Sequence, residues 1–260
     1  GRILVELPGA KEIERVKGLL QSTAQLEFWD AFKGEEFGAF IFKANDVLKE
    51  LVDTEVDSDG PLEPAEDAIS DIIGDTDAET GDDGEVNPLI DLIRSPGYNG
   101  GPVIASFEQK DRQLVTDYLN NPQVRALLSA ERRYVKFVWG IPQVQQTLGE
   151  DSQNIELVEL YALKGNRDNT PPLSGAVITD ARQAYQQNGS PSVSMQMNLK
   201  GAKVWEEMTG NAFNTAGQIA IVLDEIVYSA PGVTTGPIAG GNSEISGSFT
   251  LNEAVDLANV

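Results

Sequence analysis

The sequence contains no cysteine and no histidine among its 260 residues. Without cysteine there is no disulfide, no thiolate nucleophile and no thiolate metal site. Without histidine the chain lacks the commonest general base and metal ligand, and it cannot form a Ser-His pair. Catalysis would have to depend on carboxylates, Lys or Tyr. Metal centres built from cysteine or histidine ligands are excluded for the same reason.

Cations are also scarce, since 19 Lys and Arg face 41 Asp and Glu, for a formal net charge of -22. Nucleic acids and anionic membrane surfaces both require clustered Lys and Arg, so neither is an expected partner. No stretch approaches the ~20 consecutive apolar residues of a membrane span. Apolar residues make up 40% of the chain, which is enough for a sizeable core.

Both ends of the chain show the pattern of strands and helices. Alternation and three-and-four spacing predict a strand over 2–7, a helix over 12–20 and a strand over 23–29. Near the other end they predict a strand over 193–197, a helix over 199–208 and a hairpin of 219–223 with 226–228. Two strand-helix-strand units in this order are typical of a ferredoxin-like sheet with split βαβ topology. We expect an α+β protein with such a base domain.

Two details of the second half support this interpretation. Asp224 and Glu225 separate the two hairpin strands, although a tight hairpin turn favours Gly at the second position. Thr250 and Glu253 form a capping box, which predicts a final helix.

The middle of the chain has its own pattern. Helices are predicted over 45–51 and 106–119, and strands over 134–139 and 155–163. We therefore expect an α+β head domain, residues 30–168, inserted between the second and third strands of a base formed by 1–29 and 169–260. A short helix is expected over 181–185.

Residues 53–85 contain 14 Asp or Glu and no Lys or Arg, which predicts a loop or a disordered segment. Asp75, Asp77 and Glu79 have the alternate spacing of calcium-loop ligands. Thr80 occupies the sixth position, where such a loop needs Gly for its sharp turn. A solvated acidic segment is the favoured interpretation, and a cation site is the alternative.

Several stretches together resemble the first periplasmic domain of the SecD family, which serves the bacterial Sec translocase as a membrane-embedded auxiliary subunit. They occur in the family's order over about the first 30 and last 90 residues. They are RILVELPG at 2–9, TAQLEF at 23–28, Leu173-Ser174-Gly175 with Ile178-Thr179, Gly201, Trp205, Met208, Thr209, Asn211, IAIVLD at 219–224, Ser229-Ala230-Pro231, Ile238, Gly241, ISGSFT at 245–250, Ala254 and Leu257-Ala258. Glu225 departs from the family, which usually has Gly there.

The resemblance implies a role that is not enzymatic, for which we expect no cofactor and no metal. It implies a domain on the periplasmic side of the inner membrane that holds an emerging, unfolded secretory polypeptide. It also implies SecF and the SecYEG channel as partners, and a proton gradient that acts through membrane spans. Because those spans and their carboxylate flank this region in the family, we expect the sequence to be a fragment. A separate SecD and a SecD-SecF fusion are equally good parents.

Capturing many different polypeptides requires an accessible apolar surface and a hinge. The predicted surface is in the head and comprises Phe137, Trp139, Ile141 and Leu148. The alternative is that these residues fill the core of the head, since alternating aromatics in a strand are usually half buried. The predicted hinge residues are Gly34, Gly165, Pro171 and Pro172.

Two other function classes stay open. One is a ferredoxin-like module that binds a small ligand or regulates, or that hydrolyses through carboxylates. The adjacent acids Asp224-Glu225 and Glu206-Glu207 do not favour hydrolysis, because neighbouring side chains point apart on a strand or helix. The other is an assembly surface for further translocase subunits.

Overall fold

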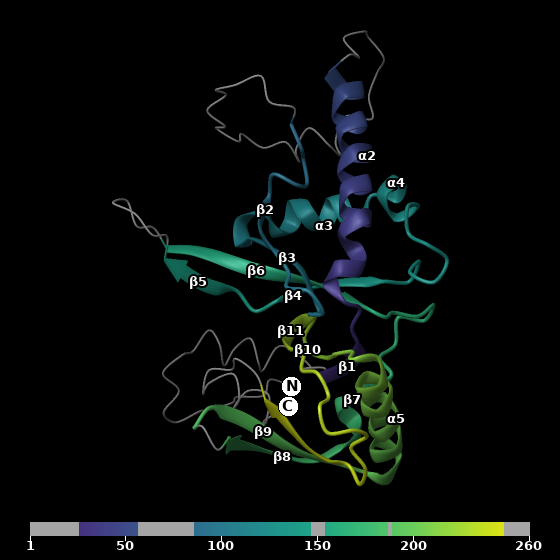
Figure 1. Cartoon of the computed structure of the whole chain (residues 1–260), viewed down its shortest axis with the longest axis vertical. Coiled ribbons are helices and arrows are strands. Elements are labelled where there is room, and N and C mark those ends of the chain that lie inside the picture. Colours follow the sequence, from purple (N-terminus) through teal and green to yellow (C-terminus); the bar gives the residue numbers. More distant parts are fainter. Residues whose placement is uncertain (1–25, 57–85, 147–153, 187–188, 247–260) are drawn as a thin grey trace, which may run out of the picture. The chain divides into compact units, whose positions relative to one another are not determined.

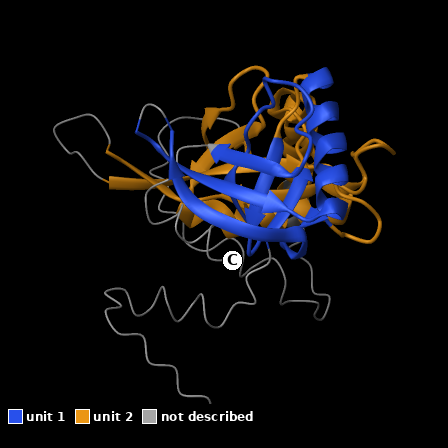
Figure 2. Cartoon of the chain, turned by 90° about the horizontal axis from the view of Figure 1, so that it is seen from below, with its two compact units in different colours: residues 1–29, 171–215, 219–260 blue, residues 30–170, 216–218 orange. Residues whose placement is uncertain are grey.

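The computed structural model describes residues 26–56, 86–146, 154–186 and 189–246 of a mixed α/β protein (Figure 1). The chain divides into two compact units, which Figure 2 distinguishes by colour. Unit 1 takes the described residues of 1–29, 171–215 and 219–260, and unit 2 takes those of 30–170 and 216–218. No helix in the described part of the chain is long and apolar enough to cross a membrane.

Unit 1 contains four neighbouring strands in the order β11-β10-β1-β7. They are β1 (Leu26–Asp30), β7 (Leu173–Ser174), β10 (Ile219–Leu223) and β11 (Ile226–Ser229). The predicted hairpin is confirmed, because β10 and β11 pair antiparallel with Leu223 opposite Ile226. Asp224 and Glu225 form the turn with positive φ angles of 49° and 64°. This is the left-handed conformation that a two-residue hairpin turn needs, and it is strained for Glu.

A separate sheet in unit 1 has the order β12-β9-β8. Its strands are β8 (Ile178–Tyr185), β9 (Pro191–Met197) and β12 (Asn242–Ser246), and the short 3-10 helix η3 (Gly175–Val177) precedes β8. The helix expected over 181–185 is wrong, because Ala181 pairs with Met195 and Tyr185 with Pro191 in this sheet. Pairing with β9 overrides the local helix preference of Ala, Arg and Gln.

Helix α5 (Leu199–Thr215) packs against strands of both sheets. Its residues Trp205, Met208 and Ala212 recur at helical spacing and are buried. They join one core cluster with alternate residues of three strands, namely Leu26 and Phe28 of β1, Val193, Met195 and Met197 of β9, and Ile219, Ile221 and Leu223 of β10. Burial of this helix face stabilises unit 1.

The ferredoxin-like arrangement itself is not confirmed. Its predicted third strand, β9, lies in the three-stranded sheet, whereas β1 and β10 neighbour each other in the other sheet. The strand predicted over 2–7 and the helices predicted over 12–20 and from Thr250 lie outside the described residues. The topology of the base therefore stays a prediction.

Unit 2 contains a sheet with the order β2-β3-β6-β4, and β5 pairs with β6 as well. The strands are β2 (Ile93–Pro96), β3 (Val103–Glu108), β4 (Lys136–Gly140), β5 (Gln143–Gln146) and β6 (Asn154–Leu163). The helices are η1 (Gly34–Phe37), α2 (Gly38–Val56), η2 (Gln109–Asp111), α3 (Arg112–Asn120) and α4 (Pro122–Arg125). Strand β6 pairs antiparallel with β3, β4 and β5, and β2 pairs antiparallel with β3.

The core of unit 2 lies between this sheet and the helices. Alternate residues of β6, Val158, Leu160 and Ala162, share a buried cluster with one face of α2 and with Val115 and Leu119 of α3. The buried face of α2 begins at Phe40 and repeats every three or four residues, so the helix extends well beyond the predicted 45–51. Helix α2 also includes residues 53–56 of the acidic segment, and residues 57–85 lie outside the described part.

Candidate functional site

Trp139 and Phe137, two residues of the predicted capture surface, lie in or against the core of unit 2. Trp139 is only 5% exposed, and its indole Nε1 donates a hydrogen bond of 2.9 Å to Thr116 Oγ1. It also meets the Phe107 ring edge to face, with centroids 5.6 Å apart. Phe137 is half buried and stacks on Phe40 at 5.8 Å. The strand therefore places both rings in packing contacts within unit 2.

The other two predicted surface residues follow β4. Ile141 is half buried, and Leu148 lies outside the described residues. Between them, β5 is exposed along its whole length, and its Val144 side chain is 64% exposed. This strand therefore has an outward apolar side chain that is accessible.

A cluster of rings and cations holds the start of unit 2 together. Arg132 lies over the rings of Phe32 and Phe37, at 5.7 and 5.3 Å from their centroids. The same guanidinium donates to the backbone oxygen of Glu36 at 2.8 Å and to its carboxylate at 2.6 Å. Arginine suits such a site because its planar fork can stack and donate at once. The cluster ties η1 to the loop before β4.

The two predicted hinge glycines are packed closely inside unit 2. A Cβ atom on Gly34 would lie 1.8 Å from the backbone oxygen of Val103, and one on Gly165 would lie 2.1 Å from that of Tyr134. The Gly34 amide also donates to Gly101 O at 2.8 Å. Both glycines therefore permit a close approach of two backbone segments.

The predicted prolines lie at the boundary between the units. Unit 2 ends at Thr170 and unit 1 resumes at Pro171, with Pro172 beside it. Before them, Asn166 closes a compact turn, because its Oδ1 accepts from the amides of Asp168 and Thr170, each at 3.1 Å. Asn169 in this turn has a positive φ of 48°. The hinge role of Gly34, Gly165, Pro171 and Pro172 stays a prediction.

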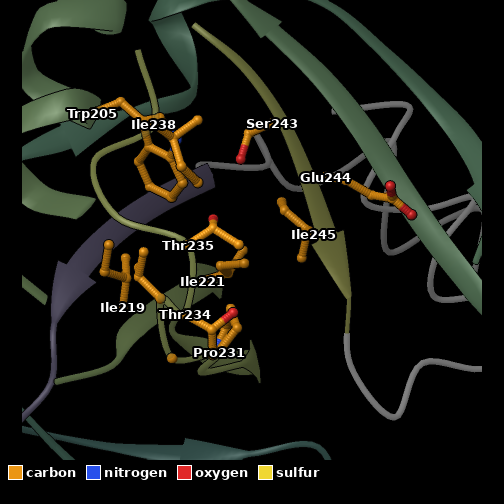
Figure 3. Close-up of a pocket in the computed structure, with 12 residues that line it drawn as sticks. Trp205, Ile219, Ile221, Pro231, Thr234, Thr235, Ile238, Ser243, Glu244 and Ile245 are labelled. Carbon is orange, nitrogen blue, oxygen red and sulfur yellow. The ribbon is translucent and has the colours of Figure 1, made fainter. Parts of the chain in front are cut away.

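Unit 1 contains a pocket of about 180 Å³ (Figure 3). Its walls come from α5, from β10, from the loop after β11 and from β12. The lining residues are mainly apolar, with threonine and serine hydroxyls at intervals: Trp205, Ile219, Ile221, Pro231, Gly232, Val233, Thr234, Thr235, Ile238, Ser243, Glu244 and Ile245.

The loop that forms one wall of the pocket is anchored to α5. Thr209 is fully buried, and its hydroxyl accepts from the Ile238 amide at 2.9 Å and donates to Trp205 O at 2.6 Å. Gly210 lets Pro237 approach, since a Cβ there would lie 3.3 Å from the proline ring. Gly241 has a positive φ of 75°, and its carbonyl accepts from Met197 N at 2.8 Å. These contacts fix the loop's course past Trp205.

The pocket has one unsatisfied donor and one charged residue. The indole Nε1 of Trp205 is buried and has no hydrogen-bond partner among the described residues, while the ring packs edge to face on Phe28 at 5.3 Å. The charged residue is Glu244, whose carboxylate accepts from Ser192 Oγ at 2.7 Å. An apolar cavity with few polar groups suits a ligand that is mostly apolar.

Three side chains with a raised pKa, Asp30, Asp111 and Tyr161, do not line this pocket. Burial raises the pKa of Asp30, and the nearby Lys164 charge partly offsets the rise. Burial likewise raises the pKa of Asp111, and it raises the pKa of Tyr161, whose hydroxyl donates to Glu159. Within the described ranges, no group of three or more acidic side chains is placed to hold a metal ion.

The adjacent acids that sequence analysis considered are on the surface. Asp224 and Glu225 are exposed in the hairpin turn, and Glu206 and Glu207 are exposed on α5. Neither pair lines the pocket.

Sequence reasoning missed the pocket because no single stretch contains it. A signal was present, however. Six of its lining residues, Trp205, Ile219, Ile221, Pro231, Ile238 and Ile245, are among those that carry the family resemblance.

Comparison with known proteins gives matches over both ends of the chain. Residues 159–260 match the family model described as SecDF, P1 head subdomain, and residues 1–32 match the model of the N-terminal part of the SecDF P1 domain. The first of these segments includes the end of unit 2 and most of the described part of unit 1.

Individual relatives agree with these models. Protein translocase subunit SecD of Rhodothermus marinus is 34% identical over 272 residues, covering 100% of this chain and 39% of that protein. Protein translocase subunit SecDF of Thermus thermophilus is 38% identical over 119 residues, covering 45% of this chain and 16% of that protein. The chain thus spans about two fifths of the length of the SecD relative, and its match to the SecDF relative covers a smaller share of that protein.

Among solved structures, SecDF in its super-membrane-facing form is 26% identical, with a TM-score of 0.31, over 46% of this chain and 23% of that chain.

Proposed function

The chain belongs to the SecD and SecDF family of protein translocase subunits, and on that premise we propose that it captures emerging, unfolded preprotein and helps complete its export. The observation that carries this proposal is the match to SecD over the whole of the chain. The family consists of membrane translocase subunits and is not a known family of enzymes. The chain spans 39% of the SecD relative, so everything the whole protein does is proposed here.

We place the capture surface on unit 2 and assign to it Phe137 and Trp139 of β4, Ile141 after that strand, and Leu148. The exposed Val144 of β5 supports this choice, because an accessible apolar side chain on a strand suits contact with many sequences. Phe137 and Ile141 are half buried, so part of each side chain is accessible as well. Trp139 contributes from beneath, since its buried indole braces the strand.

We further propose that unit 2 corresponds to the inserted head, residues 30–168, and unit 1 to a ferredoxin-like base of 1–29 and 169–260. Movement between them would occur at the hinge formed by Gly34, Gly165, Pro171 and Pro172. The position of Pro171 at a unit boundary supports the second half of this hinge. The tight packing of Gly34 and Gly165 gives these two residues the role of fixing where each linker leaves unit 2.

In the whole protein we propose that this domain lies on the periplasmic side of the inner membrane, anchored through flanking spans. SecF and the SecYEG channel would be its partners, and the proton gradient would act through the membrane spans. The net charge of -22 supports a surface that repels anionic lipid and nucleic acid and leaves the capture surface available.

Photo-crosslinking in the full-length protein tests the capture surface. Benzoylphenylalanine would replace Val144, and the matched control would replace Gln123, an exposed polar residue of α4 in the same unit. We expect adducts between position 144 and a secretory precursor stalled during export, with few or none from position 123. Equal yields at the two positions, or none at either, would contradict the proposal.

An export assay tests whether the contact at Val144 is required for function. Val144→Asp should slow export of a pulse-labelled precursor because it places a charge on an apolar contact, and Val144→Leu should not. Because Val144 is exposed, neither change should alter folding. Export at the normal rate in Val144→Asp would remove this strand from the mechanism.

A further inference from the structure

β12 offers an open strand edge next to the pocket of unit 1. Among the described residues, β12 pairs only with β9, and no described strand lies along its other edge. Figure 3 shows Ile245 of β12 pointing toward Ile221 and Glu244 pointing the opposite way. The pocket therefore opens on the face of β12 where Ile245 lies.

We propose that this edge and pocket form a second polypeptide-binding site, in which an extended segment adds to β12 and inserts one apolar side chain into the pocket. The proposal rests on the function proposed above, because the occupant is the same class of unfolded polypeptide. It goes further by assigning unit 1 a contact of its own, separate from the surface on unit 2.

Backbone chemistry selects a polypeptide as the occupant. A strand edge needs alternating donors and acceptors at strand spacing, and an extended peptide supplies both. An added strand also presents every second side chain on one face. Side chains on the Ile245 face would meet the pocket, and those between them would lie on the Glu244 face.

The lining selects an apolar side chain for the pocket. Ile219, Ile221 and Ile238 provide aliphatic walls, and Trp205 provides an aromatic wall. The buried Trp205 Nε1 lacks an acceptor among the described residues, and a carbonyl of the incoming segment would supply one. A pocket of about 180 Å³ holds a single side chain and not a folded element.

Charge selects the neighbours of that side chain. Glu244 is the one charged residue among the described residues that line the pocket, and the chain has a net charge of -22. A Lys or Arg adjacent to the apolar residue would lie on the Glu244 face of β12. Segments that alternate apolar and basic residues are therefore the preferred occupants.

A peptide of the sequence KLKLKLK, labelled with fluorescein, tests the proposal by fluorescence anisotropy with the purified chain. The composition-matched peptide KKKLLLK has the same charge without the alternation, and about 0.3 M salt limits non-specific attraction. We expect KLKLKLK to bind about ten-fold more tightly than KKKLLLK. Equal affinity would overturn the proposal.

Two further arms locate the binding. An added strand donates to the edge through the N–H groups of every second residue. In KLKLKLK these are the backbone amides of either all Leu or all Lys residues, so N-methylation of one of the two sets should abolish binding. Thr235→Trp should fill the pocket and weaken binding about ten-fold, while Thr215→Trp, at the exposed end of α5, should not. Full binding by both methylated peptides, or by Thr235→Trp, would refute strand addition at this pocket.

Benzoylphenylalanine at Thr234 tests whether another part of the chain is already the occupant. Without peptide, intense crosslinks from this position to residues 1–25 or 247–260 would overturn the proposal. With peptide, crosslinks to the peptide support it.

The two proposals fail differently. If an unfolded secretory precursor binds normally to Thr235→Trp but not to Val144→Asp, the pocket site is wrong and capture by unit 2 stands. If the precursor does not bind the unaltered chain, the proposed function fails first.

Discussion

The packing of unit 2 predicts that adding a side chain at Gly34 destabilises the fold. A Cβ at this position would lie 1.8 Å from Val103 O, 2.4 Å from Val103 C and 2.9 Å from Ile104 N. These atoms belong to the backbone of β3, which pairs with β2 on one side and β6 on the other. Since β3 cannot yield without breaking a ladder, Gly34→Ala must lift the segment before α2 away from the sheet.

The cost can be worked from two contributions. Overpacking a tight site costs about 1–3 kcal/mol. Separation of the segment also weakens the hydrogen bond from the Gly34 amide to Gly101 O, which contributes about 1 kcal/mol. We expect Gly34→Ala to lower the free energy of unfolding by about 3 kcal/mol, a large part of the about 5–15 kcal/mol typical of a domain.

Gly38 provides the matched control. It begins α2, and a Cβ there would meet nothing within 4 Å. Gly38→Ala should raise stability by about 0.5–1 kcal/mol, because Ala restricts the unfolded chain and favours the helix. Urea denaturation of the purified variants, with hydrogen exchange at β3 amides to localise the change, measures both. If Gly34→Ala unfolds at the same urea concentration as the unaltered chain, the segment at Gly34 is not packed closely against β3 and the packing argument is wrong.

Three further changes test the core, the pocket loop and a buried charge. Trp139→Phe should cost about 1–2 kcal/mol in urea denaturation because it loses the hydrogen bond to Thr116, and Trp139→Ala about 3–5 kcal/mol; unchanged stability in both would make Trp139 a surface residue. Thr209→Val should destabilise unit 1 by about 1–3 kcal/mol because it leaves the Ile238 amide without its acceptor, whereas Thr209→Ser keeps the hydroxyl and should not. Equal melting temperatures of Thr209→Val and the unaltered chain would show that this hydrogen bond does not stabilise the loop. Burial raises the pKa of Asp30 in the folded chain above its ordinary value of 3.8, so ionisation of this group destabilises the fold as the pH rises. Asp30→Asn should therefore be more stable than the unaltered chain at neutral pH and equally stable below pH 3.8. A gain in stability that persists in acid would exclude this cause.

The sequence predicted those elements whose pattern is local. The 219–223 and 226–228 hairpin follows from two β-rich runs separated by two residues, and the structure has it at β10 and β11. Helix α4 also begins at a local signal, because Pro122 is its first residue and Asn121 Oδ1 accepts from the Gln123 amide at 2.8 Å.

Elements that depend on a distant partner were harder to predict. Residues 178–185 become a strand through pairing with β9, although their composition also allows a helix. The start of α2 was missed because Phe37 and Phe40 have no clean period until contacts with Phe137 show which face is buried. Pairings of this kind leave little trace in a single sequence.

The candidate sites differ in the same way. The predicted capture residues Phe137 and Trp139 were identified by alternation, but alternation does not say which face of a strand is covered. The pocket joins α5, β10, β12 and a loop held by Thr209, so only the folded chain brings its walls together.

Binding of unfolded polypeptide by the isolated chain tests the central claim most directly. A secretory precursor diluted from urea would be titrated with the purified chain, alongside the folded mature form of the same protein and a library of small metabolites. We predict saturable binding of the unfolded precursor, weaker or no binding of the folded form, and loss of affinity in Val144→Asp. Saturable binding of a metabolite, with none of the unfolded precursor, would contradict the account and favour a small-ligand module.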